Sequence, residues 1–264
     1  MTQLQNRFST HLYSVRFLSF LAFTAVFLLN SCSSKTPEVQ EIIDNAIVQS
    51  GGPTIANASI QFKFRDHYYK AKRENGVRTF ERCTDAACLL QRDVLDNKGD
   101  FTRFRESALI QVPDSMKQKY ANSINSVHYF SVLPFGLNDP AVTKQLMDIH
   151  DVKGKSYYRV KVTFAQEGGG EDFQDEYMYW IATENFAVDY IAYNYQTSEG
   201  GTRFREAYNE RIINGVRFVD YRNYKPKTQF PPLTDLDAQF ESNELTLLST
   251  IETENPKVIP LASK

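Results

Sequence analysis

Apolar and polar residues alternate with a period of two through much of residues 156–224. Five runs rich in aromatic and β-branched residues lie in this segment, separated by short turns of Gly, Asn, Ser or acidic residues. The pattern is typical of an antiparallel meander. Alternation places Tyr177 and Tyr179 on one face of the sheet. It places the apolar Met178 and Trp180 on the other, so we expect both faces to be covered.

A first meander is predicted earlier in the chain, over residues 58–112, with about five or six strands. Asn75 and Gly76 form a dipeptide that is typical of a tight hairpin turn between two of these strands. Before this meander, Ile42 and Ala46 belong to a set of apolar residues at helical spacing. This spacing predicts an amphipathic helix near the start of the mature chain.

Helical spacing returns between the two meanders. Tyr120 and Ile124 belong to an apolar set that predicts a helix. Asp139 precedes a proline, which predicts the start of a second short helix that ends near Met147. The resulting helical insert, residues 114–147, has to pack over a sheet face or over the mouth of a curved sheet.

These elements predict a mainly β protein, with a curved antiparallel sheet or incomplete β-barrel of about 10–12 strands. The N-terminal helix and the insert over residues 114–147 are expected to cover its concave face. One half-barrel domain is expected over residues 38–255, after a tether over residues 32–37. A tail is expected over residues 256–264.

The N-terminus has the pattern of a bacterial lipoprotein signal peptide, residues 1–31. Its apolar run, residues 17–29, is shorter than the roughly 20 residues needed to span a bilayer. Leu-Asn-Ser-Cys resembles a lipobox that ends at Cys32, so we expect lipidation of Cys32 and anchoring to a lipid bilayer. By resemblance to such lipoproteins, Ser33 in place of Asp favours the outer membrane, and the absence of a following acidic run favours its periplasmic face. An ordinary cleaved signal with an incidental cysteine is the alternative.

Two further cysteines, Cys83 and Cys88, bracket a short turn between strand-like runs. An exported protein folds in an oxidising compartment, so a disulfide across a small hairpin is expected. The alternative is a thiol pair for metal or redox chemistry, which needs CxxC-type spacing or nearby histidines that this segment lacks.

The formal net charge of −2 provides no basic field for a nucleic-acid backbone, so we expect no nucleic-acid partner. The sequence contains no HExxH or GxSxG motif and no cysteine with a basic partner that would mark a nucleophile. These absences favour a protein that is not an enzyme.

An acidic, glycine-rich loop connects two strands of the second meander. Glu167, Glu171 and Asp172, with Asp175 nearby, form a weak candidate Ca²⁺ site, although the spacing of an EF-hand is absent. The alternative is a solvated hairpin that binds no ion, and we expect no cofactor.

Arg203 and Arg205 lie on one face of a strand near the same end of the sheet. Both could bind a ligand carboxylate or phosphate. The alternative is cross-strand pairing with Asp175 or Glu176.

His128 lies in an apolar stretch, SVHYFSVLPFGL, and could face a cavity or be a hydrogen-bonded helix histidine. Residues 127–137 are a candidate movable lid. Tyrosines suit a cavity wall, because each has an apolar ring and a polar tip. The candidate ligand-binding residues are His128, Phe130, Tyr177, Tyr179, Trp180, Tyr193, Tyr195, Arg203 and Arg205.

Several long segments resemble a family of uncharacterised Bacteroidota lipoproteins: HYFSVLPFGLNDPAV, VTFAQEGGGEDF, YWIATENFAVDYIAY, GGTRFREAYN and NGVRFVDYRNYKP. Some relatives are labelled deoxyribose-phosphate aldolase. An aldolase barrel needs alternating strands and helices and a buried Schiff-base lysine. Here the strands follow one another by short turns, and Lys161 is expected on a solvated face.

The layout of helix, meander, helices and meander is similar to the lipoprotein-carrier fold, an incomplete barrel whose concave apolar face is covered by helices. This likeness implies a cavity for a lipid or another hydrophobic molecule. The leading hypothesis is a membrane-anchored periplasmic lipoprotein that binds or carries an amphipathic ligand. One alternative is a hydrolase or lyase that uses His128 with acidic loop residues. Another is a structural or partner-binding envelope protein with a filled core.

Overall fold

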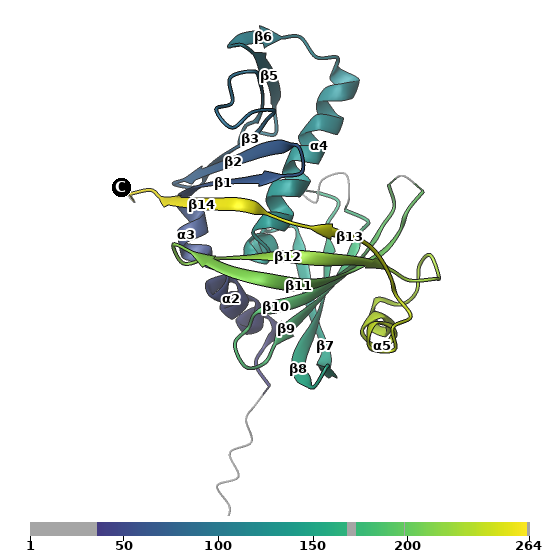
Figure 1. Cartoon of the computed structure of the whole chain (residues 1–264). Coiled ribbons are helices and arrows are strands. Elements are labelled where there is room, and N and C mark those ends of the chain that lie inside the picture. Colours follow the sequence, from purple (N-terminus) through teal and green to yellow (C-terminus); the bar gives the residue numbers. More distant parts are fainter. Residues whose placement is uncertain (1–35, 168–172, 198, 263–264) are drawn as a thin grey trace, which may run out of the picture. The chain divides into compact units, whose positions relative to one another are not determined.

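The computed structural model describes residues 36–167, 173–197 and 199–262. The chain divides into two compact units, residues 1–37 and 38–264, and the second contains all the helices and strands of the described part. The predicted signal peptide and the lipidation site, Cys32, lie outside the described residues and stay predictions. Within the second unit, the described strands form two seven-stranded antiparallel sheets, neither of which is closed (Figure 1).

The first sheet has the strand order β14-β1-β2-β3-β4-β5-β6. Both Asn75 and Gly76 have positive φ, as a tight hairpin between β2 and β3 requires. The strands of this sheet are β1 (Ala58–Phe64), β2 (His67–Glu74), β3 (Val77–Cys83), β4 (Gln91–Leu95), β5 (Phe101–Arg105), β6 (Ala108–Ile110) and β14 (Glu254–Pro260).

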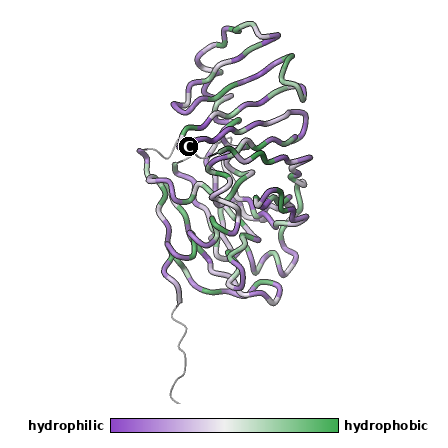
Figure 2. Tube along the Cα trace, turned by 90° about the vertical axis from the view of Figure 1, so that its left-hand side faces the viewer, coloured by the Kyte–Doolittle hydropathy of each residue, from purple (hydrophilic) through white to green (hydrophobic). Residues whose placement is uncertain are grey.

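The second sheet has the strand order β13-β12-β11-β10-β9-β8-β7. The predicted mainly β fold with helical cover is confirmed, and Figure 2 shows hydrophobic and hydrophilic residues alternating along the strands. The strands of this sheet are β7 (Val142–Val152), β8 (Lys155–Phe164), β9 (Glu176–Ala182), β10 (Val188–Tyr195), β11 (Gly201–Ile213), β12 (Val216–Lys225) and β13 (Thr246–Ile251).

Two expectations about element boundaries are wrong. The second short helix of the insert is absent from the described residues, because β7 begins at Val142 and pairs with β8 as far as Val152. Its period-two burial pattern shows that residues 142–146 follow strand rather than helical spacing. The expected tail over residues 256–264 contains most of β14, which pairs with β1. The polar composition of an edge strand resembles that of a tail.

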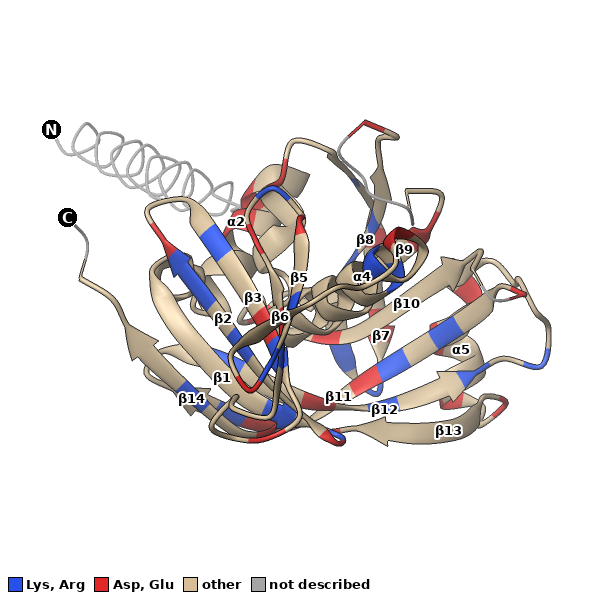
Figure 3. Ribbon diagram, turned by 90° about the horizontal axis from the view of Figure 1, so that it is seen from above, with Lys and Arg blue, Asp and Glu red and all other residues tan. Residues whose placement is uncertain are grey.

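The described helices are α2 (Val39–Gln49), α3 (Gly52–Ala56), α4 (Asp114–Ser131) and α5 (Leu236–Glu241), with the 3₁₀ turns η1 (Phe135–Asn138) and η2 (Leu233–Asp235). Figure 3 shows α4 lying within the curve made by the strands of the two sheets. Ala121 and Ile124 of α4 pack in the core of the first sheet. Tyr129 and Phe130, near its end, pack against the core of the second. The helix α4 therefore links the two cores.

Both faces of the second sheet are covered, as the sequence predicts. Ile42 and Ile43 of α2 share a buried cluster with Tyr179 on the inner face. On the outer face, Trp180 packs in a separate cluster with Phe240 of α5. This division confirms the expected alternation along β9.

A close contact joins the first helices to the second sheet. Gly51, between α2 and α3, has a φ of +88°, and a Cβ atom added to it would lie 2.1 Å from the carbonyl oxygen of Gly215. Gly215 is in the turn between β11 and β12, and the backbone N–H of Arg217 donates to the carbonyl of Ser50 (3.1 Å). The absence of a side chain at Gly51 therefore permits this approach.

The two sheets meet through consecutive strands near the end of the chain. The strand β13 is the edge of the second sheet, and β14 is the edge of the first. The side chain of Asn214 donates a hydrogen bond to the carbonyl of Val258 in β14 (2.7 Å). In the described part of the chain, no helix has both the length and the apolar composition required to cross a membrane.

Candidate functional site

A cavity of about 280 Å³ lies beside α4, where this helix passes from the first sheet to the second. Its walls come from α4, from β1 of the first sheet and from β11, β12 and β13 of the second. The lining residues are Phe62, Phe64, Arg65, Ser126, Val127, Phe130, Ser131, Arg205, Val219, Tyr221, Asn223, Ser249, Ile251 and Thr253. Seven of these fourteen residues are polar or charged, but apolar atoms form most of the exposed wall, as is usual for a small-molecule site.

Arg205 is the buried charged residue of this cavity, at 9% exposure, whereas Arg65 is exposed. The Arg205 guanidinium lies over the ring of Phe130, with 4.2 Å between its Cζ and the ring centroid. Its Nη2 donates a hydrogen bond to the hydroxyl of Tyr193 (2.7 Å). The cavity therefore combines a buried cation with aromatic walls.

The structure does not show an ion pair between Arg205 and Asp175 or Glu176, which is the alternative role for Arg205. Glu176 pairs with Lys161, with 2.8 Å between the charged atoms. The carboxylate of Asp175 accepts a hydrogen bond from the backbone N–H of Gln196. No salt bridge among the described residues includes Arg205. The pairing of Lys161 also fits its expected solvated face.

The aromatic candidates on β9 and β10 divide into neighbours of the cavity and residues remote from it. Tyr177 stacks on Tyr193, with 5.2 Å between ring centroids, and Phe130 lies 5.7 Å from Tyr193. Burial raises the pKa of Tyr177, which stays a neutral phenol. Tyr179 is fully buried in the same cluster. These tyrosines support the wall behind Arg205 and Phe130.

Three other candidates lie away from this cavity. Trp180 faces the opposite side of the sheet, where its indole N–H donates to Asp237 (2.9 Å). Arg203 lies over the ring of Tyr195 (4.9 Å), and neither residue lines the cavity. Asn223 lines the cavity but is not among the predicted site residues. The alternating pattern does not show that β12 places Asn223 beside Arg205.

His128 does not face the cavity, although it follows Val127 directly. Its side chain is 1% exposed and stacks on Phe80, with 4.4 Å between ring centroids. Its Nε2–H donates a hydrogen bond to the carbonyl oxygen of Glu81 (3.2 Å). Burial lowers the pKa of His128 to about 3. A sealed neutral imidazole cannot contact a substrate, so the geometry gives no support to a hydrolase or lyase built on His128.

This burial predicts a dependence of stability on pH. Unfolded His128 takes up a proton as the pH falls through about 6.5, whereas in the folded protein its pKa is about 3. Between these values the unfolded state binds more protons, so acidification removes about 1.4 kcal/mol of stability per pH unit. We expect this slope to be smaller by about that amount in His128→Gln, measured by urea unfolding from pH 6 to pH 4. Equal slopes in the two proteins would show that folded His128 accepts the proton.

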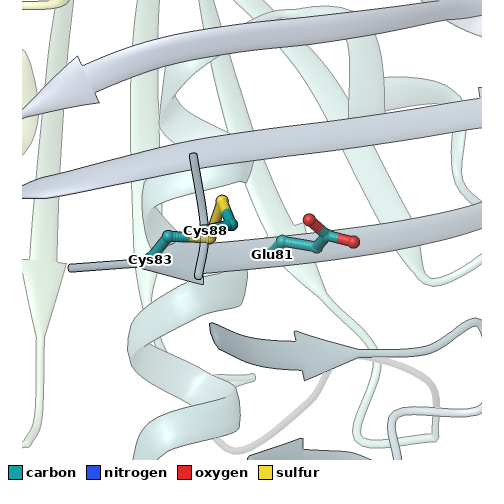
Figure 4. Close-up of side chains that lie close together, drawn as sticks. All are labelled: Glu81, Cys83 and Cys88. Atoms are coloured by element: carbon teal, nitrogen blue, oxygen red, sulfur yellow. A yellow bond between two sulfur atoms is a disulfide. The ribbon is translucent and has the colours of Figure 1, made fainter. Parts of the chain in front are cut away.

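The predicted disulfide between Cys83 and Cys88 is confirmed. Glu81 lies beside it, with its carboxylate within 4.8 Å of both sulfur atoms (Figure 4). While the cysteines are bonded to each other, they are not thiolate ligands for a metal. The structure thus favours the structural bridge over the metal or redox alternative.

A larger cavity of about 430 Å³ lies beside the disulfide. Its lining includes Cys88 and Leu89 but is mostly polar, with Lys63, Lys70 and Arg92 among its residues. The cavity beside α4 is smaller, but its apolar walls and buried cation make it the better candidate for a specific site.

The weak candidate Ca²⁺ site cannot be built from the structure. Glu171 and Asp172 lie outside the described residues. Glu167 is exposed, and Asp175 is buried with its carboxylate facing the backbone of Gln196. The calcium site therefore stays a prediction.

The fold and the site define a half-barrel protein with a small apolar cavity beside its central helix. The chain belongs to a family of unknown function, described as "Family of unknown function (DUF6503)", whose model matches residues 16–253. This match confirms the expected membership of an uncharacterised family. No curated protein matches the chain.

Solved structures with a similar layout cover most of the chain. A LolA superfamily protein from Nitrosomonas europaea is 13% identical, with a TM-score of 0.46, over 86% of this chain and 96% of that one. A DUF1329 family protein from Desulfovibrio piger is also 13% identical, with a TM-score of 0.48, over 84% and 93%. A domain from Vibrio parahaemolyticus, described as an outer membrane lipoprotein-sorting protein, is 6% identical, with a TM-score of 0.43, over 84% and 93%.

Proposed function

We propose that this protein binds one hydrophobic or amphipathic small molecule in the cavity beside α4. The observation that carries the proposal is a pocket with mostly apolar walls, open on one side, between two densely packed cores. Ile124 and Phe218 are fully buried in the first core, as are Ile43 and Tyr179 in the second. The space lined by Val127 and its neighbours is not filled in this way.

The size of the cavity favours a ligand with a single chain. Its volume of about 280 Å³ lies just below the range for ligand sites, roughly 300–1,000 Å³. A cavity of this size has room for one apolar chain or a compact ring system, and several acyl chains would not fit together. The proposed ligand is therefore smaller than a multiply acylated lipid.

Access to the cavity is proposed from the side of α4 that carries Ser126 and Val127. The segment after α4 is anchored, because Leu133 and Leu137 are buried against the second sheet. Residues 127–137 thus do not form a loose lid as a whole. A small displacement of α4 itself would widen the entrance.

The proposed location is the periplasmic face of the outer membrane, with Cys32 as the lipid anchor. The signal-peptide pattern and the lipobox-like residues support this location. The Cys83–Cys88 disulfide is also consistent with an oxidising compartment. An acylated Cys32 would keep the cavity near the bilayer from which a hydrophobic ligand could come.

Filling the cavity with a larger side chain should weaken ligand binding. In Val127→Trp the larger side chain occupies space that a ligand would take, so we expect the affinity for decan-1-ol and decanoate to fall at least about tenfold. Isothermal titration calorimetry on the protein without its signal peptide measures both ligands. Ser115→Trp is the matched control, because Ser115 is an exposed residue of the same helix. Unchanged affinity in Val127→Trp would contradict the proposal.

A structural or partner-binding role is the second candidate, favoured by the dense packing of both cores. Under this alternative the cavity is a packing defect with no ligand. The same titration distinguishes the two, because wild-type protein that binds neither decan-1-ol nor decanoate would favour the structural role.

A further inference from the structure

We infer that the ligand is a single-chain anionic amphiphile whose head group pairs with Arg205. This inference rests on the proposed function and specifies the class of molecule that the cavity accepts. The apolar chain would lie against Phe62, Val127 and Ile251, which line the same cavity. The head group would lie against a polar row on the second sheet.

The Arg205 guanidinium lacks the partners that a buried cation requires. Among the described residues its only side-chain hydrogen bond is to Tyr193, and its buried Nε has no partner. An arginine has five N–H donors and stays charged at physiological pH. Burial of such a charge is costly unless it is paired or hydrogen-bonded. Contacts with Phe130 and Tyr193 offset part of this cost, and an anion in the cavity would supply the missing acceptors.

Other buried arginines of the second sheet have carboxylate partners. Arg159 pairs with Asp237 and with Asp148. Arg217 pairs with Asp189 and Glu210. These pairs show how this fold usually neutralises a buried guanidinium, so the contrast at Arg205 points to an external counterion.

Arg73 of the first sheet provides a second comparison. It is also buried and has no ion pair among the described residues. Its guanidinium lies over the rings of Phe80 and Phe135, at 5.0 and 5.5 Å. Arg73 does not line the cavity, and Arg65, which does, is exposed; Arg205 is thus the buried, unpaired guanidinium beside this apolar space.

A polar row extends from Arg205 across three strands. Arg205 of β11 pairs in register with Asn223 of β12, and Asn223 pairs with Ser249 of β13. All three residues line the cavity. The Asn223 side-chain oxygen is buried without a hydrogen-bond partner, and its Nδ2 lies 3.4 Å from the Ser249 hydroxyl. Rotation of this amide would turn its N–H donors toward an anion held by Arg205.

The chemistry of the row suits an oxyanion. A carboxylate or phosphate could accept from the guanidinium of Arg205 and also from the Asn223 amide and the Ser249 hydroxyl. Charge-assisted hydrogen bonds of this kind are the strong ones in protein sites. A neutral alcohol of the same chain length would fill the apolar part and leave the charge of Arg205 unpaired.

The test compares three ligands with the same ten-carbon chain: decanoate, decyl phosphate and decan-1-ol. For wild-type protein we expect calorimetry to show at least one of the two anions binding about tenfold or more tightly than the alcohol. In Arg205→Gln this preference should be lost, while the affinity for decan-1-ol stays within about threefold. Whichever anion binds better identifies the head group as carboxylate or phosphate.

Arg203→Gln is the matched control, because Arg203 lies two residues earlier on the same strand, loses the same charge and does not line the cavity. It should keep the preference for the anion. Arg205→Lys keeps the positive charge and should retain part of the preference, which covers the case in which Arg205→Gln does not fold. Circular dichroism checks the fold of each variant.

Wild-type protein that binds decan-1-ol as tightly as both anions would overturn the inference and leave the proposed function standing. An anion preference that survives in folded Arg205→Gln would also overturn it. Failure of all three ligands to bind wild-type protein would reject the proposed function itself.

Discussion

Replacement of Asp93 by alanine is expected to lower the free energy of unfolding by about 3–5 kcal/mol. The carboxylate of Asp93 is almost fully buried between two arginines of the first sheet. Its oxygens lie 2.8 Å from Arg82 and 2.6 Å from Arg103. Removal of the carboxylate leaves two largely buried cations side by side without their common partner. Urea unfolding followed by circular dichroism measures the loss.

The effect should extend to the central helix. Arg82 donates a hydrogen bond to the hydroxyl of Ser123 on α4 (3.2 Å). Arg103 lies over the ring of Tyr120 on the same helix, with 4.3 Å between its Cζ and the ring centroid. Asp93 thus orients two of the side chains that attach α4 to the first sheet.

Glu176→Ala is the control for this prediction. Glu176 forms a partly exposed ion pair with Lys161 on the second sheet. Such pairs contribute about 0–1 kcal/mol, so this change should have little effect. Equal losses in the two variants would show that burial of the Asp93 cluster adds nothing to its contribution.

Gly51→Ala is the second change with a large expected effect, about 3 kcal/mol or more. The positive φ of Gly51 costs an alanine about 1–2 kcal/mol. The new Cβ would also overlap the Gly215 carbonyl, and forcing extra atoms into a packed site costs about 1–3 kcal/mol. The obstacle is backbone on another element, so no side-chain rotation relieves it. Thermal and urea unfolding both report the change.

Gly76→Ala separates the two contributions. Gly76 also has a positive φ, +78°, but a Cβ added there would meet nothing within 4 Å. We expect only the backbone cost, about 1–2 kcal/mol. If Gly51→Ala destabilised the protein no more than Gly76→Ala, the close approach of the α2–α3 segment to the β11–β12 turn would be refuted.

The sequence predicts local structure well where alternation is strong. Along β9, the alternation of Tyr179 and Trp180 correctly assigns the two covered faces of the second sheet. The disulfide between Cys83 and Cys88 also follows from local spacing, because the bridged residues flank one turn. In each case the residues that carry the signal are within a few positions of one another in the sequence.

The site required information that local patterns lack. Val127 and His128 are adjacent in the sequence, but successive helical residues differ by about 100° in direction. One therefore lines the cavity while the other is buried against Phe80 of the first sheet. The pairing of Arg205 with Asn223 depends on the register of β11 with β12, and this pairing contains an irregularity farther along the two strands. Residue types alone reveal neither which side of α4 faces the cavity nor the register of β11 with β12.

The pairing of β14 with β1 has a consequence for biogenesis. Ala58 is opposite Pro260, so the edge of β1 is completed by a strand that is synthesised much later than β1 itself. Contacts between such distant positions make folding slow, because a long loop must close before they form. A nascent chain in which β14 has not yet left the ribosome thus exposes the backbone edge of β1, and the first sheet reaches its native topology only after β14 has been synthesised.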